Sequence, residues 1–142
     1  MRIAKIILGA ATLCLGSWLP ALPAHAIDLT GLWTTDVDAC DKVFATKGKS
    51  ASFTKNSEVF GRAFIIEGKK IRSPRATCTV TKSKESGEVL NMIASCATDI
   101  MYSDMQFSLR LLGDGKISRI FPEFGESGEM AFIYYRCPSR AK

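Results

Sequence analysis

The sequence predicts an all-β protein folded as a single antiparallel up-and-down barrel of about eight or nine strands. Three observations favour this fold class: short runs of alternating apolar and polar residues recur along the chain, glycine-containing turns separate them, and helical periodicity is nearly absent. A β-sandwich is the alternative, because the same strands and turns fit two packed sheets. One short helical turn over 36–44 and two disulfides complete the predicted fold.

Residues 1–26 have the pattern of a cleaved secretory signal peptide. A basic start and an apolar run lead to Ala24-His25-Ala26, whose small residues meet the requirement of signal peptidase. Two prolines interrupt the apolar run before it reaches the roughly 20 residues of a transmembrane helix. We therefore expect cleavage between Ala26 and Ile27, an exported protein that is periplasmic or secreted, and a single domain over 27–142.

A first strand is predicted just after the expected cleavage site, where Gly31, Leu32 and Trp33 follow one another. This Gly-x-Trp sequence resembles the first strand of lipocalin-like (calycin-type) barrels, in which the tryptophan closes one end of the barrel. Small bacterial periplasmic barrels that inhibit proteases begin in a similar way. The resemblance implies that Trp33 is a structural anchor. The alternative interpretation is a core tryptophan of any other β fold.

The stretch 76–98 predicts a β-hairpin, because two alternating runs meet at a turn formed by Ser86-Gly87-Glu88. This pairing sets Cys78 opposite Cys96, at the roughly 4.5 to 5.5 Å between Cα atoms that a disulfide accepts. The same register divides the hairpin into two faces. The face toward the core has Cys78, Val80, Met92, Ala94 and Cys96, and the outer face has Thr77, Thr79, Thr81, Ser83, Asn91, Ile93 and Ser95.

Four cysteines follow residue 26, and in a short exported chain they predict two disulfides. Three pairings are possible in principle, and the hairpin favours Cys78 with Cys96. Cys40, on the helical turn, then pairs with Cys137 in the last strand. A zinc site formed by the four thiols is the alternative, but the chain has no CxxC pair and the expected compartment is oxidising.

The other strands are predicted from alternation and from turn residues. Residues 47–57 are polar and predict a loop or a short edge strand. The clearest period of two places four apolar side chains on one face between 105 and 111. Further strands are predicted over 28–35, 59–67, a short run ending at Ser73, 116–121 and 130–137.

The single histidine, His25, lies in the predicted signal peptide. Its loss excludes Ser-His-Asp and Cys-His catalysis and the usual histidine metal sites, and disulfides would leave no free thiol. We therefore expect a protein that is not an enzyme and that holds no cofactor and no metal. A hydrolase that uses the carboxylates of Glu123, Glu126 and Glu129 is the alternative.

Charge is divided along the sequence. Residues 42–84 carry eleven basic side chains against two acidic ones, whereas residues 85–129 carry eight acidic against three basic. In a barrel that keeps sequence order, one side would be basic, which favours an anionic partner such as lipid headgroups, an acidic polysaccharide or an acidic protein. The alternative is that the halves neutralise each other. The densest basic residues, and the candidate binding residues, are Lys69, Lys70, Arg72 and Arg75.

Phe121 and Phe124 flank Pro122 in a predicted loop and are candidates for contact with a partner protein, since aromatic side chains dominate interfaces. The alternative is that they fold back into the core over the barrel mouth.

The function these features favour is a non-enzymatic exported envelope or periplasmic binding protein, expected to be a monomer that binds no nucleic acid. It would inhibit a protease or a lysozyme, or bind an anionic surface. Lysozyme-inhibitor barrels resemble one another in a Ser-Gly-x-x-Tyr loop, and neither Ser86-Gly87 nor Ser127-Gly128 has that tyrosine. The alternative is a lipocalin-like carrier of a small apolar ligand, which needs a cavity that a chain of this length has little room for.

Signal-peptide cleavage and disulfide formation can both be tested by mass spectrometry. Protein purified from an exporting host without reduction should have a denatured mass that begins at Ile27 and lacks the hydrogens lost in two disulfides. A mass that includes residues 1–26, or four free thiols in a chain that begins at Ile27, would contradict it.

Overall fold

The computed structural model describes residues 27–121 and 131–138, so the predicted signal peptide lies outside the described part. Eight strands form a closed barrel in which every pair of neighbours is antiparallel. The barrel, rather than the sandwich, is therefore confirmed. Its strands are β1 (Gly31–Thr34), β4 (Ala63–Glu67), β5 (Lys70–Arg72), β6 (Thr77–Ser86), β7 (Val89–Ala97), β8 (Tyr102–Gly113), β9 (Lys116–Ile120) and β10 (Phe132–Arg136).

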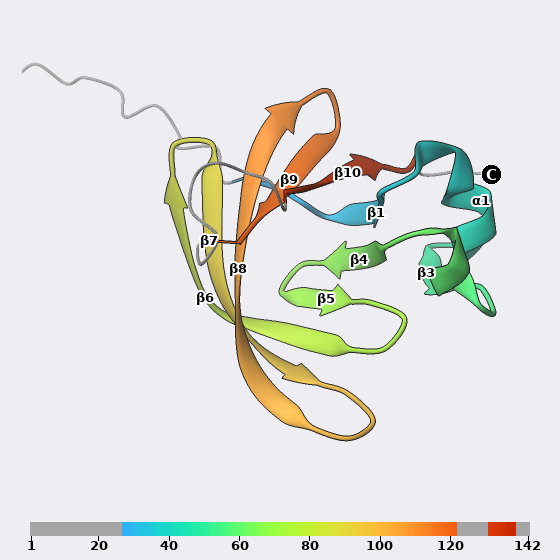
Figure 1. The fold of residues 1–142 in the computed structure, drawn as a ribbon, viewed down its shortest axis with the longest axis horizontal. Helices are drawn as coiled ribbons and strands as arrows, with labels where there is room; N and C mark the ends of the chain where they lie inside the picture. Colours follow the sequence, from blue (N-terminus) through green and yellow to red (C-terminus); the bar gives the residue numbers. More distant parts are fainter. Residues whose placement is uncertain (1–26, 122–130, 139–142) are drawn as a thin grey trace, which may run out of the picture.

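The strands from β4 to β10 follow one another around the barrel in sequence order, and β1 lies between β10 and β4 (Figure 1). On one side of β1, Trp33 pairs with Arg136 of β10, and on the other it pairs with Phe64 of β4. A strand of four residues thus closes the barrel. Because side chains alternate along a strand, Trp33 and Phe64 point inward while Leu32 and Ile65 point outward.

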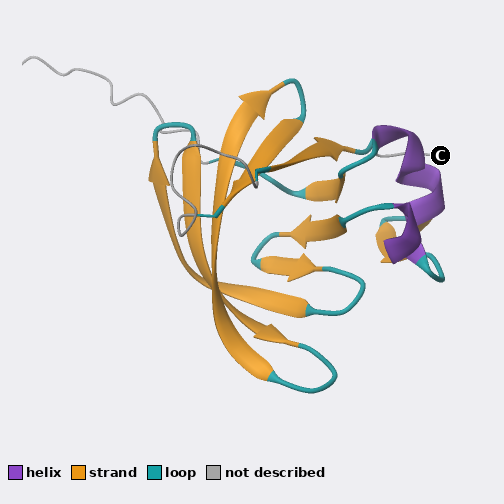
Figure 2. Cartoon of the chain, viewed as in Figure 1, coloured by secondary structure: helices purple, strands orange, loops and turns teal. Residues whose placement is uncertain are grey.

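The segment between β1 and β4 packs on the outside of the barrel (Figure 2). It contains the 3₁₀ turn η1 (Val37–Ala39), α1 (Cys40–Val43), the hairpin β2 (Phe44–Lys47) and β3 (Ser50–Phe53), and a second 3₁₀ turn, η2 (Ser57–Phe60). No helix within the described residues has the length and apolar composition that a membrane span requires.

This outer cover has its own apolar core. Val43 and Phe44 are buried against Ala63 and Ile65, on the outward face of β4. The centroids of the Phe44 and Phe53 rings lie 5.5 Å apart. Since these contacts shield the outer face of β4 from water, that strand is apolar on both sides.

The predicted helical turn is confirmed. The side chain of Asp36 accepts a hydrogen bond from the backbone N–H of Asp38 at 3.0 Å, which caps η1, and Cys40 begins α1. Within the predicted polar stretch 47–57, the short-strand interpretation is right for 50–53 and the loop interpretation is wrong there.

The strand predicted over 59–67 is wrong at its start, since the strand begins at Ala63. Val59 belongs to η2, which follows Asn56 in the left-handed conformation (φ 58°). Gly61 then adopts φ 120°, which ends the turn and redirects the chain into β4. The apolar side chains near Val59 had suggested a strand, but these two backbone conformations set the boundary.

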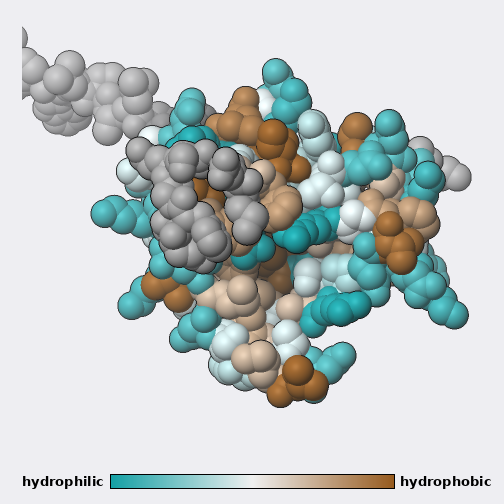
Figure 3. All heavy atoms as spheres, in the orientation of Figure 1, coloured by the Kyte–Doolittle hydropathy of each residue, from teal (hydrophilic) through white to brown (hydrophobic). Residues whose placement is uncertain are grey.

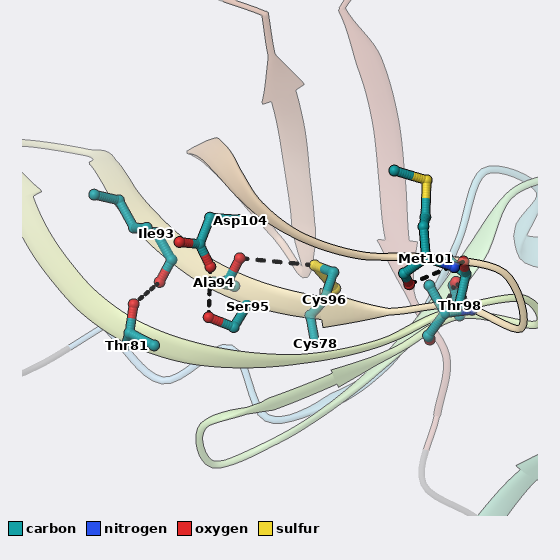
Figure 4. Close-up of a disulfide and its surroundings, with 11 residues drawn as sticks. Cys78, Thr81, Ile93, Ala94, Ser95, Cys96, Thr98, Met101 and Asp104 are labelled. Carbon is teal, nitrogen blue, oxygen red and sulfur yellow. Dashed lines mark hydrogen bonds between the residues drawn. A yellow bond between two sulfur atoms is a disulfide. The ribbon is translucent and has the colours of Figure 1, made fainter.

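The β6–β7 hairpin pairs Cys78 with Cys96, as predicted (Figure 4). Its turn is shorter than predicted, since Ser86 already pairs with Val89. A β-bulge at Thr81 takes up the difference, so the register at the cysteines is the predicted one.

The same bulge changes the face of the residues between it and the turn. Ser83 lies opposite the buried Met92 rather than on the outer face, so its predicted placement is wrong. A bulge adds one residue to one strand and thereby inverts the alternation of every residue beyond it.

Both predicted disulfides are present, and the zinc alternative is therefore wrong. Cys78 and Cys96 join neighbouring strands inside the barrel, with Cα atoms 3.9 Å apart. Cys40 and Cys137 join α1 to the residue after β10, with Cα atoms 5.8 Å apart. The second bridge ties the outer cover to the edge of β1, because the Cys137 N–H also donates to the Leu32 carbonyl at 2.8 Å.

The two disulfides should differ in their contribution to stability. Their sequence separations of 97 and 18 residues correspond to about 5 and about 3 kcal/mol, respectively, in the chain-entropy model. Replacing Cys40 and Cys137 by alanine should therefore lower the free energy of unfolding in urea more than replacing Cys78 and Cys96. A larger loss from the second pair would show that packing of the buried sulfurs outweighs loop closure.

Candidate functional site

The inward faces of the barrel strands enclose a cavity of about 350 Å³. Its volume lies within the range of small-molecule sites in proteins, roughly 300 to 1,000 Å³. The walls come from strands β4 to β10 and are mainly apolar. They include Phe64 and Ile66 of β4, Ile71 of β5, Met92 of β7, and Phe107 and Leu109 of β8.

Among the described residues, the cavity opens at the end of the barrel where β4 begins and β7 ends. Its mouth is lined by residues of η2, by the β5–β6 loop 73–76 and by Met105 near the start of β8. Met105 has 41% of its surface exposed although it stands on the inward face of β8, in alternation with Phe107. Hydrophobic surface is visible between hydrophilic side chains on the face drawn in Figure 3. An apolar molecule could therefore reach the interior from this end.

Two polar side chains on neighbouring strands interrupt the apolar wall. In β9, Arg119 follows the buried Ile117 by two residues and therefore points inward with it. Arg119 pairs directly with Phe132 of β10, and the next inward residue of β10 is Tyr134, which is only 2% exposed. The guanidinium of Arg119 lies 4.9 Å from the ring centroid of Phe107, a cation–π contact that orients it along the wall.

Arg62, just before β4, is a third polar residue of the wall. Backbone contacts fix its place: the Thr35 N–H donates to the Arg62 carbonyl at 3.0 Å, and the Arg62 N–H donates to Thr35 Oγ1 at 3.1 Å. A Cβ atom on Gly61 would lie 2.8 Å from that Oγ1. Any other residue at 61 would therefore press on the Thr35 hydroxyl that accepts from the Arg62 N–H. The Arg62 guanidinium lies 3.8 Å from the ring centroid of Phe132.

Burial raises the pKa of the Tyr134 phenol above its usual value, and the positive charges of Arg119 and Arg62 offset part of this rise. Tyr134 is therefore protonated at neutral pH and can donate a hydrogen bond into the cavity. An apolar wall thus surrounds a neutral phenol and the guanidinium groups of Arg62 and Arg119.

One ion pair crosses the mouth. Arg75, in the β5–β6 loop, lies 3.6 Å from the carboxylate of Glu58 in η2. The Arg75 side chain is 83% exposed, so this pair contributes little to stability. Both residues line the cavity.

The four basic residues predicted as a binding cluster do not form one free patch. Lys69 and Lys70 are at the β4–β5 turn, and Arg75 is in the loop at the other end of β5. Arg72 lies between them and donates to the Ala51 carbonyl of β3 at 2.9 Å and to Glu67 at 3.1 Å. Of the four, only Arg75 lines the cavity.

Of the two aromatic residues predicted to contact a partner protein, Phe121 lies within the described residues and Phe124 does not. Phe121 is half-buried and packs edge-on against Phe132, with ring centroids 6.0 Å apart, which fits the core interpretation. Phe124 lies outside the described residues, as do Glu123, Glu126 and Glu129.

Trp33 is 1% exposed, donates from Nε1 to the Leu29 carbonyl at 2.9 Å, and has the Arg136 guanidinium 4.8 Å from its ring centroid. It packs in the barrel core with Phe64 and Leu29.

A second hollow of about 300 Å³ lies toward the other end of the barrel, beside Ile27–Thr30 and the β4–β5 turn. Ile66, Ile71 and Met92 line both spaces, so these side chains separate them. The second hollow is more polar, with Lys69, Lys82 and Glu85 in its wall.

Arg62, Arg119 and Tyr134 are not among the site residues predicted from the sequence. The signal for Arg119 is its position in Ile117-x-Arg119-x-Phe121, where a charged residue replaces an apolar one on the inward face of a strand. A buried charge is costly without a partner, so a charge at such a position points to a function.

No protein-family model, curated protein or solved structure matches the chain significantly.

The raised pKa of Tyr134 predicts a loss of stability in alkali. Unfolded tyrosine ionises near pH 10, whereas folded Tyr134 keeps its proton to higher pH. The stabilising contribution of Tyr134 is thus complete below about pH 10 and decreases as pH rises through the folded pKa. Urea unfolding between about pH 9 and pH 12 should show a smaller alkaline decrease for Tyr134→Phe than for the unmodified protein. Equal decreases would contradict the prediction.

Proposed function

We propose that the protein is an exported, non-enzymatic binding protein that carries a small apolar molecule in its barrel cavity. The observation that carries this proposal is the cavity itself, about 350 Å³ in volume, open at one end and walled by apolar side chains. An eight-stranded barrel is just wide enough to hold one small ligand when its side chains leave the centre free. A carrier of a small apolar ligand is therefore better supported than an inhibitor or a protein that binds an anionic surface.

Export is supported by two features of the structure. The chain has two disulfides, and disulfides form and persist in an oxidising compartment. The backbone nitrogen of Ile27 also donates to a carboxylate oxygen of Glu85 at 3.0 Å. Cleavage between Ala26 and Ile27 would convert that nitrogen into an ammonium group facing Glu85, a favourable pair.

A second candidate function, binding and inhibition of a secreted protease or lysozyme, is favoured by the β7–β8 turn. Ile100 is 92% exposed, Met101 57% and Tyr102 73%, and together they form an apolar tip. Exposed apolar side chains that adjoin in this way are typical of contact sites. Absence of inhibition of lysozymes and secreted proteases at micromolar concentrations would exclude this function.

The carrier function predicts binding of an uncharged apolar probe. N-phenyl-1-naphthylamine should bind with a dissociation constant on the order of micromolar and a stoichiometry of about one, as followed by its fluorescence. Met105→Trp should weaken binding about tenfold or more, because the larger side chain fills the mouth of the cavity.

Ile93→Trp is the matched control. Ile93 has the same exposed fraction as Met105, 41%, and lies on the outer face of the neighbouring strand. This variant should bind the probe as the unmodified protein does. No binding by the unmodified protein, or equal losses in both variants, would exclude the cavity as the binding site.

A further inference from the structure

Three of the polar residues that line the cavity provide more than a purely apolar ligand requires. Arg62, Arg119 and Tyr134 come from three different places in the sequence and line one cavity. Arg62 and Arg119 both adjoin Phe132, two residues before Tyr134 on β10, and their positive charges offset part of the rise that burial causes in the pKa of the Tyr134 phenol. The three groups therefore lie close together. An uncharged hydrocarbon would gain nothing from this arrangement.

The described residues supply no acidic partner for either arginine. The ion pairs in this part of the chain join Arg72 with Glu67 and Arg75 with Glu58. Arg62 and Arg119 instead contact aromatic rings. A guanidinium that stacks on a ring keeps its N–H groups directed outward from its edge, where they can donate to an oxygen.

Exposure decreases in order among the three groups. Arg62 is exposed, Arg119 is half-buried and Tyr134 is buried. A charged group that entered from the mouth would thus meet a cation at the rim, a second cation further in, and then a phenol that donates a hydrogen bond. Two guanidinium forks and one hydroxyl match the two oxygens of a carboxylate.

We propose that the ligand is an amphipathic monocarboxylic acid, with its carboxylate bound by Arg62, Arg119 and Tyr134 and its apolar chain in the remainder of the cavity. This inference rests on the proposed carrier function and specifies its ligand class. The apolar chain would lie against Ile66, Ile71 and Met92, which form the cavity wall farther from the mouth.

The test compares two ligands that differ only in the head group. Decanoate and 1-decanol, below their aggregation concentrations at neutral pH, compete with N-phenyl-1-naphthylamine for the full exported chain. Decanoate should bind about ten- to a hundredfold more tightly than decanol, the range expected for hydrogen bonds to a charged group. Arg62→Gln and Arg119→Gln should each reduce that ratio about tenfold, because each weakens the binding of decanoate more than the binding of decanol.

Arg75→Gln is the matched control, since it removes a cation that lines the same cavity but already pairs with Glu58. It should lower the ratio of decanoate to decanol affinity much less than Arg62→Gln does, because the Glu58 carboxylate that it leaves unpaired is exposed to solvent. Arg119→Lys, which keeps the charge but loses the planar fork, should give an intermediate ratio. Arg62 is exposed, so its variant should fold even where substitution of the half-buried Arg119 destabilises the barrel.

The outcomes separate the two proposals. Equal affinities for decanoate and decanol, or equal losses of both ligands in Arg62→Gln, would overturn the carboxylate site and leave the carrier function in place. A ratio lowered as much by Arg75→Gln as by Arg62→Gln would show general attraction by positive charge and would also overturn the site. Failure of decanoate, decanol and the naphthylamine probe to bind would overturn the carrier function and this inference with it.

Discussion

Closure of the barrel through β1 is the constraint on which the other features depend. This strand has only four residues, yet it pairs with β10 on one edge and with β4 on the other. Hydrogen bonds of such a short strand would fray easily without support. The support comes from both of its faces, where Trp33 is buried in the barrel core and Leu32 packs against the outer cover, and from the Cys40–Cys137 disulfide beside it.

The cavity follows from that closure. Without β1 the sheet would be open between β4 and β10, and Arg62 and Tyr134 would no longer belong to one wall. The outer cover contributes indirectly. It buries the outward side of β4, and the Thr35 hydroxyl fixes the backbone of Arg62 by accepting a hydrogen bond from its N–H. The segment between β1 and β4 thus helps to hold Arg62 at the cavity wall.

Much of the fold could be predicted from local patterns. The β6–β7 hairpin has alternation and a glycine turn, so its pairing and its disulfide followed from the sequence. The bulge at Thr81 could not be predicted, since bulges depend on the twist and closure of the whole sheet. The start of β4 could not be predicted from the apolar pattern either, because the positive φ values of Asn56 and Gly61 set it, and alternation of apolar residues does not reveal them.

The candidate site was harder to predict than the fold. Clusters of charge in the sequence drew attention to Lys69 and Arg72, which the structure places at a turn and in contact with β3. The cavity residues Arg62, Arg119 and Tyr134 are isolated in sequence and gather only when β4, β9 and β10 meet around β1. A single polar residue at an inward position marks a candidate site residue in the sequence. Which of these residues lie together depends on how the barrel closes.

Entry of a ligand into the barrel can be observed by methionine methyl NMR. Met92 and Met105 line the cavity, whereas Met101 lies at the exposed β7–β8 turn. Titration of ¹³C-methyl-methionine protein with N-phenyl-1-naphthylamine should shift the Met92 and Met105 signals together and leave Met101 unchanged. A shift of Met101 with none at Met92 would place the probe on the outer tip and contradict the account.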